Sequence, residues 1–169
     1  EIYQKTTAMI KEKHMTRRWC MEHSNVKLVS TTEDPVDDLR YHIALNKEKM
    51  FTRVITAFRP DKAMFLEEET FADYLNTLAE VSGVEITSFE TMLNALENRL
   101  KFFKEITGTT VSDDGIPHFT WADYTMEEIG AIFEKARKNE PMSEHEADQY
   151  RSAFLYEMAR MYNRNGYVM

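Results

Sequence analysis

The feature that most constrains this chain is the alternation of short, β-branched segments with much longer helical ones. Strand-like segments are expected at 25–30, 51–58, 109–112 and 167–169. Two of the intervening stretches, about 64–107 and 117–165, are too long for one crossover helix. Strands that alternate with helices are typical of parallel β-α units. The sequence therefore predicts a helix-rich α/β fold with about four parallel strands, which form either an open sheet or an arc of a barrel.

Hydroxyl and acidic residues at capping-box spacing mark where the long helices begin. The pairs with this spacing are Thr70 and Asp73, Thr87 and Glu90, Thr125 and Glu128, and Ser143 and Glu146. In a capping box, each side chain binds a backbone N–H that the first turn leaves unpaired. Gly83, Gly108 and Gly166 follow helical stretches, where left-handed caps are expected. One further helix is expected over 1–23, and another from a cap at Asp34 to about Asn46.

The composition excludes several classes of protein. Acidic residues outnumber basic ones by 29 to 21, and the net charge of -8 repels a sugar-phosphate backbone, so no nucleic-acid partner is expected. No run approaches the roughly 20 apolar residues that span a bilayer, so no membrane association is expected. Cys20, expected to be buried, is the single cysteine, which excludes an internal disulfide and fits a reducing, cytoplasmic compartment. No linker or repeat divides the chain, so 1–169 is interpreted as one segment.

Polar clusters follow three of the predicted strands, at 30–34, 58–62 and 112–114. Ligands of parallel α/β proteins gather at the carboxyl ends of the strands. A planar arginine such as Arg59 can hold a carboxylate there, or donate to adjacent hydroxyl groups. The alternative is purely structural: Asp34 caps a helix, Arg59 pairs with a nearby acid and Asp113 caps a turn. These patterns alone indicate only a candidate anion site at Arg59.

The five histidines form no His-x-His or His-Glu-x-x-His pair, so no metal site is predicted within the chain. His14 and His145 are expected to be solvated on helices. His118 lies in a Pro-His-Phe segment predicted to be a loop, where a site role is open but unsupported. No glycine-rich nucleotide loop and no Gly-x-Ser-x-Gly motif is present.

Four segments, in matching order and spacing, resemble the uronate (glucuronate) isomerase family. Residues 25–42, beginning Asn-Val-Lys-Leu-Val-Ser-Thr-Thr-Glu-Asp-Pro, resemble its NVK-V-TTDDP-D-L-H stretch. Residues 57–63 resemble its SWRPDKA motif, residues 111–113 its VSDH motif and residues 166–169 its GWV-Q segment. The resemblance covers essentially the whole chain from Asn25, and TT(D/E)DP followed by RPDKA is a specific combination.

The resemblance implies a fold, a reaction and a cofactor. Members of the family are similar to (β/α)8 TIM barrels of the amidohydrolase superfamily with helical insertions. They interconvert D-glucuronate with D-fructuronate, and D-galacturonate with D-tagaturonate, through an enediol. A divalent metal, usually zinc, is held by an N-terminal His-x-His and a late Asp-x-Arg. This chain contains neither, so it is expected to be an internal part of a larger barrel, with insertions at about 64–107 and 117–165. It is expected to hold no metal and to be inactive alone.

Of the functional residues, the arginine of the RPDKA motif maps onto Arg59. The resemblance implies that it contacts the hexuronate substrate and donates to hydroxyl or enediolate oxygens. Thr32, Asp34, Asp61 and Asp113 are weaker candidates for supporting the substrate site.

One departure from the family motif keeps a second hypothesis open. Asp114 stands where the family has a histidine after VSD, so the protein could instead be a diverged, non-catalytic relative that binds a sugar acid or a partner. A third hypothesis is an independent helical interaction module. An open edge of parallel strands would also favour self-association, so a homo-oligomer is compatible with the sequence.

Overall fold

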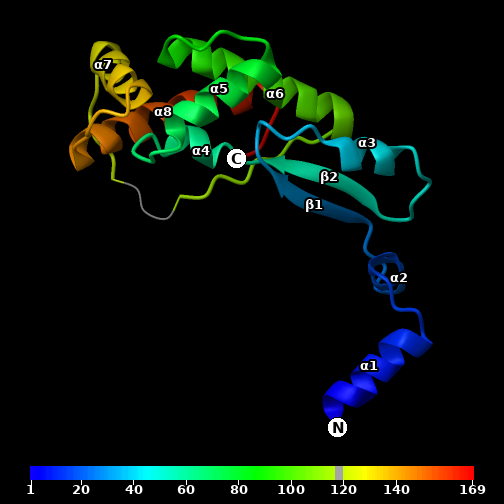
Figure 1. Ribbon diagram of the computed structural model, residues 1–169. Helices are drawn as coiled ribbons and strands as arrows, with labels where there is room; N and C mark the ends of the chain where they lie inside the picture. Colours follow the sequence, from blue (N-terminus) through cyan, green and yellow to red (C-terminus); the bar gives the residue numbers. More distant parts are fainter. Residues whose placement is uncertain (117–119) are drawn as a thin grey trace.

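The computed structural model describes residues 1–116 and 120–169 (Figure 1). Along the chain its elements are α1 (Ile2–Glu12), α2 (Arg17–His23), β1 (Leu28–Glu33), α3 (Arg40–Asn46), β2 (Arg53–Phe58), α4 (Asp61–Met64), α5 (Phe71–Ser82), α6 (Phe89–Thr107), α7 (Met126–Arg137) and α8 (Glu144–Asn165). The start of the second predicted helical stretch and the candidate His118 lie outside the described residues. Among the residues described, no helix has the length and hydrophobicity needed to cross a membrane.

The sheet is parallel, as predicted. In β1 and β2, Leu28 lies opposite Arg53 and Glu33 lies opposite Phe58. Parallel pairing continues on the far side of β2 through isolated bridges, from Phe58 to Ser112 and from Val111 to Val168. Chain segments therefore lie side by side in the order β1, β2, 111–112 and 168, and their carboxyl ends share one edge.

Of the about four parallel strands predicted, the described residues form two as strands, and the other two segments pair only through isolated parallel bridges. A side chain explains the short third segment. The Thr109 hydroxyl donates to the carbonyl oxygen of Thr56, an acceptor that a longer backbone ladder would use. The hydroxyl also accepts from the Val111 N–H at 3.4 Å. Backbone pairing is thus confined to the residues immediately before the chain turns at Asp113.

The N-terminal residues form two helices rather than the single predicted one. His14 takes a positive φ of 47° between them, and Thr16 begins α2 by accepting a hydrogen bond from the Trp19 N–H at 3.1 Å. Neither helix buries a residue. In Figure 1 both lie below β1, away from α3 to α8. Cys20 is exposed on α2, so the expectation that it is buried is wrong.

The helix after β1 begins later than expected because aspartates hold the preceding backbone in turns. Each aspartate accepts a hydrogen bond from a backbone N–H two residues ahead: Asp34 from Val36 at 3.0 Å, Asp37 from Leu39 at 2.7 Å and Asp38 from Arg40 at 3.0 Å. These local bonds compete with helical ones. Leu39 takes a left-handed φ of 54°, and α3 begins only at Arg40.

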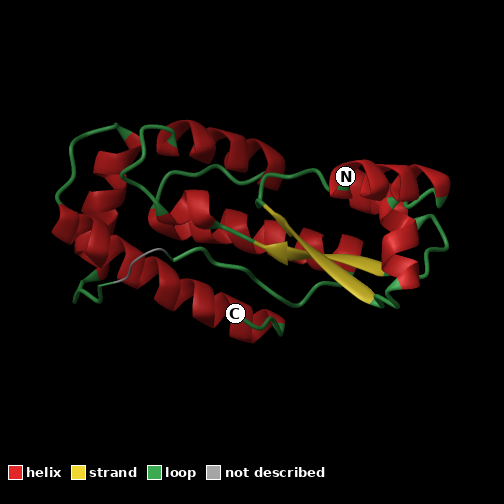
Figure 2. Ribbon diagram, turned by 90° about the horizontal axis from the view of Figure 1, so that it is seen from below, coloured by secondary structure: helices red, strands yellow, loops and turns green. Residues whose placement is uncertain are grey.

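Helices α4 to α8 enclose the core, with α6 packed against β2 and against the neighbouring helices (Figure 2). Their apolar faces meet in a cluster of fully buried side chains that includes Phe58, Leu78, Met92, Leu96, Leu100, Phe103, Phe133, Tyr150, Phe154, Met158 and Met161. The Tyr150 hydroxyl donates to the carbonyl oxygen of Ala63 at 2.7 Å, which satisfies its one polar group. The core thereby fixes α4, which directly follows β2, against α8.

Two of the four predicted capping boxes are confirmed, at Thr125 with Glu128 and at Ser143 with Glu146. The box at α6 is displaced by one residue and is formed by Ser88 and Thr91. Thr70 makes no side-chain capping bond, so the prediction there is wrong. The predicted left-handed caps are all present, at Gly83, Gly108 and Gly166, with φ values of 70°, 68° and 70°.

Candidate functional site

The shared edge of the parallel segments brings together candidate residues that are far apart in the sequence. Arg59 directly follows β2, and its backbone N–H donates to the Glu33 carbonyl oxygen at 3.0 Å. Asp113 follows the bridged segment beside β2, and its N–H donates to the Phe58 carbonyl oxygen at 3.0 Å. The Thr32 hydroxyl, on β1, donates to Asp113 Oδ2 at 2.9 Å. The three candidates thus form one cluster.

The Arg59 guanidinium lies between two acids of its own chain. Its Nε donates to the carbonyl oxygen of Asp113 at 3.0 Å and lies 3.2 Å from Asp61 Oδ2. Its Nη2 lies 3.5 Å from Asp113 Oδ1. The structural alternative is therefore right that Arg59 pairs with nearby acids. The side chain remains 40% exposed, so part of the guanidinium can still reach a ligand.

Asp61 binds Arg59 with one carboxylate oxygen and the backbone with the other. Its Oδ1 accepts a hydrogen bond from the Gly115 N–H at 2.9 Å. Burial raises the pKa of Asp61, while the Gly115 N–H and the Arg59 charge oppose that shift. The carboxylate is thus a fixed support for Arg59.

Asp34 lies in the same region but does not cap a helix. Besides the Val36 N–H, its Oδ1 accepts from the Tyr74 hydroxyl at 3.1 Å, and its Oδ2 lies 3.3 Å from Lys62 Nζ. These contacts tie the end of β1 to α5 and α4. Burial, reinforced by the Asp34 charge, raises the pKa of Tyr74 well above its ordinary value.

Asp114, the residue that departs from the family motif, faces α8. Its Oδ2 accepts from the Ser112 hydroxyl at 2.8 Å, and its Oδ1 accepts from the Tyr162 hydroxyl at 3.1 Å. Burial raises the pKa of Asp114, and these two hydrogen bonds oppose the shift. Sequence reasoning missed Tyr162, because a tyrosine on an otherwise apolar helix face gives no sign of a polar partner.

A second polar contact missed by sequence reasoning lies under the end of β1. His42, 7% exposed on α3, places Nε2 2.8 Å from the Thr31 hydroxyl oxygen and 3.7 Å from Glu33 Oε1. One hint of a role for His42 came from the sequence, because this residue lies within the segment 25–42 that resembles the family. The contact fixes α3 to the carboxyl end of β1.

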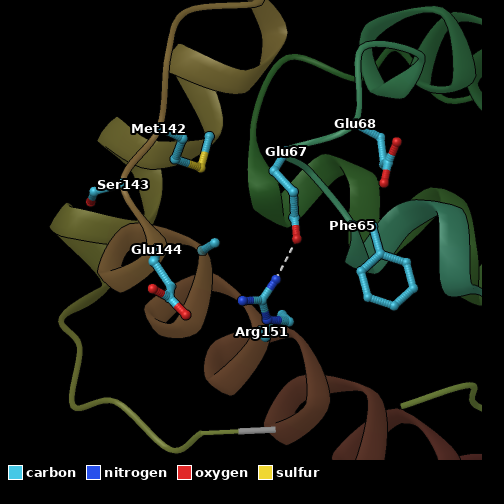
Figure 3. Close-up of a pocket in the computed structure, with 8 residues that line it drawn as sticks. Phe65, Glu67, Glu68, Met142, Ser143, Glu144 and Arg151 are labelled. Carbon is cyan, nitrogen blue, oxygen red and sulfur yellow. Dashed lines mark hydrogen bonds and ion pairs between the residues drawn. The ribbon is translucent and has the colours of Figure 1, made fainter. Parts of the chain in front are cut away.

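A cavity of about 580 Å³ lies away from this edge, between the residues after α4 and the start of α8 (Figure 3). Arg151 points into it and pairs with Glu67 and with Asp148. Glu68 and Glu144 also line it, so its remaining charge is acidic. An acidic lining does not suit an anionic ligand, whereas the strand-end cluster offers a half-exposed guanidinium.

No group of three or more histidine, cysteine, aspartate or glutamate side chains within 1–116 and 120–169 could hold a metal ion. The strand-end carboxylates are instead committed to protein partners. Asp61 binds Gly115 and Arg59, and Asp114 binds Ser112 and Tyr162.

The parallel sheet and its polar edge place the chain among α/β proteins whose ligands bind at the carboxyl ends of strands. A family model described as glucuronate isomerase matches residues 1–169, and the chain belongs to that family. It is 38% identical over 170 residues to the uronate isomerase of Lachnospira eligens, and 40% identical over 170 residues to that of Lachnoclostridium phytofermentans. In both comparisons all of this chain is covered, but only 36% of the relative.

Two solved structures have a fold similar to that of this chain. A crystal structure of glucuronate isomerase from Caulobacter crescentus is similar with a TM-score of 0.86 and 31% identity, over 98% of this chain and 34% of that one. The crystal structure of uronate isomerase from Thermotoga maritima has the same TM-score at 24% identity, over 93% of this chain and 35% of that one, and shows likeness of fold alone. The chain thus spans about a third of the length of its relatives.

Proposed function

We propose that this chain supplies a substrate-binding arginine to a uronate isomerase. The full protein would interconvert D-glucuronate with D-fructuronate, and D-galacturonate with D-tagaturonate. A proton leaves C2 and is returned to C1, while the O2 hydroxyl becomes the carbonyl and the O1 carbonyl becomes a hydroxyl. The observation that carries the proposal is Arg59, held by acids at the carboxyl end of a parallel strand yet 40% exposed.

The chemistry expected of Arg59 follows from its geometry. Negative charge develops on O1 and O2 of the enediolate as the proton leaves C2. A guanidinium already fixed by Asp61 and Asp113 can donate to these oxygens without reorganising at the moment of reaction. Arginine stays charged at every physiological pH, so Arg59 binds and stabilises the intermediate rather than transferring its proton.

The proposed setting of this segment is a (β/α)8 TIM barrel of the amidohydrolase superfamily. In that setting β1, β2 and the bridged segments are an arc of the barrel. Helices α5 and α6, and α7 and α8, are insertions within about 64–107 and 117–165. Support comes from the parallel order of the segments and from the fraction of the relatives' length that the chain covers.

Among the described residues, no group of three or more histidine, cysteine, aspartate or glutamate side chains could hold the metal that the family resemblance implies, and Asp61 and Asp114 have protein partners. We therefore propose that a divalent metal, zinc, is held by residues outside this chain. No step assigned to Arg59 depends on it. An exposed, single cysteine fits a reducing compartment, so the proposed location is the cytoplasm.

The proposal is tested by replacing Arg59 with methionine in the full-length protein. The expected loss in kcat for glucuronate isomerisation is about 10²–10³, as for other donors to a developing oxyanion. Arg53→Met is the matched control, because Arg53 lies at the opposite end of β2 and donates from Nη2 to the Thr107 carbonyl oxygen at 3.2 Å. Unchanged kinetics for Arg59→Met would remove Arg59 from the site. Uronate binding without turnover by the unmodified protein would instead favour the diverged binding protein.

A further inference from the structure

Gly115 contacts Asp61, the residue whose carboxylate holds the Arg59 guanidinium. Its backbone N–H donates to Asp61 Oδ1 at 2.9 Å, while Asp61 Oδ2 lies 3.2 Å from Arg59 Nε. The Asp61 carboxylate therefore bridges the turn at Gly115 and the guanidinium. Any displacement of this carboxylate changes the position of the arginine.

The space beside Gly115 is already filled by that pair. A Cβ atom at this position would collide with Asp61 Oδ2 and would lie 3.3 Å from Arg59 Nη2. The distance to Oδ2 is far shorter than a carbon–oxygen contact allows. The carboxylate must shift to admit a Cβ atom, and its other oxygen accepts from the Gly115 N–H, so the shift disturbs that bond as well.

Backbone conformation does not explain this glycine. Among the described glycines, Gly83, Gly108 and Gly166 have positive φ values, whereas Gly115 does not. An L-residue could adopt its backbone conformation without left-handed strain. What Gly115 provides is the close approach of Asp61 and Arg59 to the main chain.

We infer that Gly115 is a positioning residue for the proposed reaction: its N–H and its missing side chain together hold Asp61 Oδ2 against Arg59 Nε. This inference rests on the proposed substrate-binding role of Arg59. A methyl group at position 115 pushes Oδ2 out of place and releases one edge of the guanidinium. Misplacement of a binding group by about 1 Å can cost on the order of 10²-fold in rate.

The test is a double-mutant cycle in the full-length protein, with Gly115→Ala, Asp61→Ala and the double variant. Gly115→Ala is expected to lower kcat for glucuronate isomerisation by about 10- to 100-fold, with a smaller change in KM. In the Asp61→Ala background it is expected to cause no further loss, because the group with which the methyl collides is gone. Gly130→Ala is the control, since nothing lies within 4 Å of a Cβ atom there, and kcat should not change.

The outcomes separate the inference from the proposed function. Wild-type kcat in Gly115→Ala, or the same loss in both backgrounds, overturns the positioning role. An unmodified protein that does not isomerise uronates contradicts the proposed function instead. In that case the same cycle, measured as free energies of unfolding, tests the contact on which the inference is built: coupling between Gly115→Ala and Asp61→Ala supports that contact, and additivity overturns it together with the inference.

Discussion

Replacing Arg99 with methionine probes how the helical layer is fixed to the loop that carries Asp34. Arg99 lies on α6 and is 7% exposed. Its guanidinium donates to three backbone carbonyl oxygens: Nε to Pro35 at 2.7 Å, Nη2 to Asp37 at 2.8 Å and Nη1 to Val81 at 3.2 Å. One side chain thereby joins the loop after β1 to the end of α5.

Two opposing effects determine how far Arg99→Met lowers the free energy of unfolding. A buried carbonyl oxygen that loses its donor costs about 1–3 kcal/mol, which applies to Pro35 in full and less to the more exposed Asp37 and Val81. Methionine also relieves the cost of burying a charge, a cost that is seen in the lowered pKa of Arg99 and arises mainly from desolvation. Because three acceptors lose one shared donor, we expect a loss of about 3 kcal/mol in the free energy of unfolding.

The assay is urea unfolding of the full-length protein, followed by circular dichroism, together with amide hydrogen exchange over residues 34–39. Lys101→Met is the matched control, because Lys101 lies on the same helix with its side chain 60% exposed and pairs with Glu97 at 3.4 Å. Such a surface pair contributes at most about 1 kcal/mol. Equal losses in the two variants, or unchanged exchange in the loop for Arg99→Met, would refute the role given to Arg99.

Three further predictions concern helix ends and one ion pair. Arg164 lowers the pKa of Glu97 to about 2, so the stability from this carboxylate is present above its unfolded pKa of 4.5 and is lost as pH falls toward 2. Glu97→Gln should flatten that part of the pH profile of unfolding. Gly166→Ala, at a φ of 70°, should lower the free energy of unfolding by about 1 kcal/mol in urea titrations. Ser143→Ala removes a capping box and should also cost about 1 kcal/mol, whereas Thr70→Ala, with no capping bond to lose, should cost much less.

Regular elements with local signals were predictable from the sequence. The clearest case is α8, whose start was marked by the capping-box pair Ser143 and Glu146 and whose end was marked by Gly166. Parallel pairing followed from the alternation of strands and helices. Local signals failed where side chains compete with the backbone. The aspartates after β1 delay α3, and the Thr109 hydroxyl limits pairing beside β2.

The sequence predicted where the candidate site lies in the fold, but not which of its residues contact one another. Polar residues after parallel strands had to share one edge, and Thr32, Arg59 and Asp113 do. Nothing in the sequence states which acid holds which edge of the guanidinium, because Asp113 lies 54 residues from Arg59 and the two meet only through the sheet register. The crowding beside Gly115 likewise depends on the folded positions of two segments, the one with Arg59 and Asp61 and the one with Gly115.

The most direct test is a crystal structure of the full-length protein with D-glucuronate bound. The prediction is a hydrogen bond of about 3 Å from the Arg59 guanidinium to a substrate oxygen, at the carboxyl end of β2. D-glucuronate bound away from Arg59, for example in the cavity lined by Arg151 and Glu144, would contradict the account.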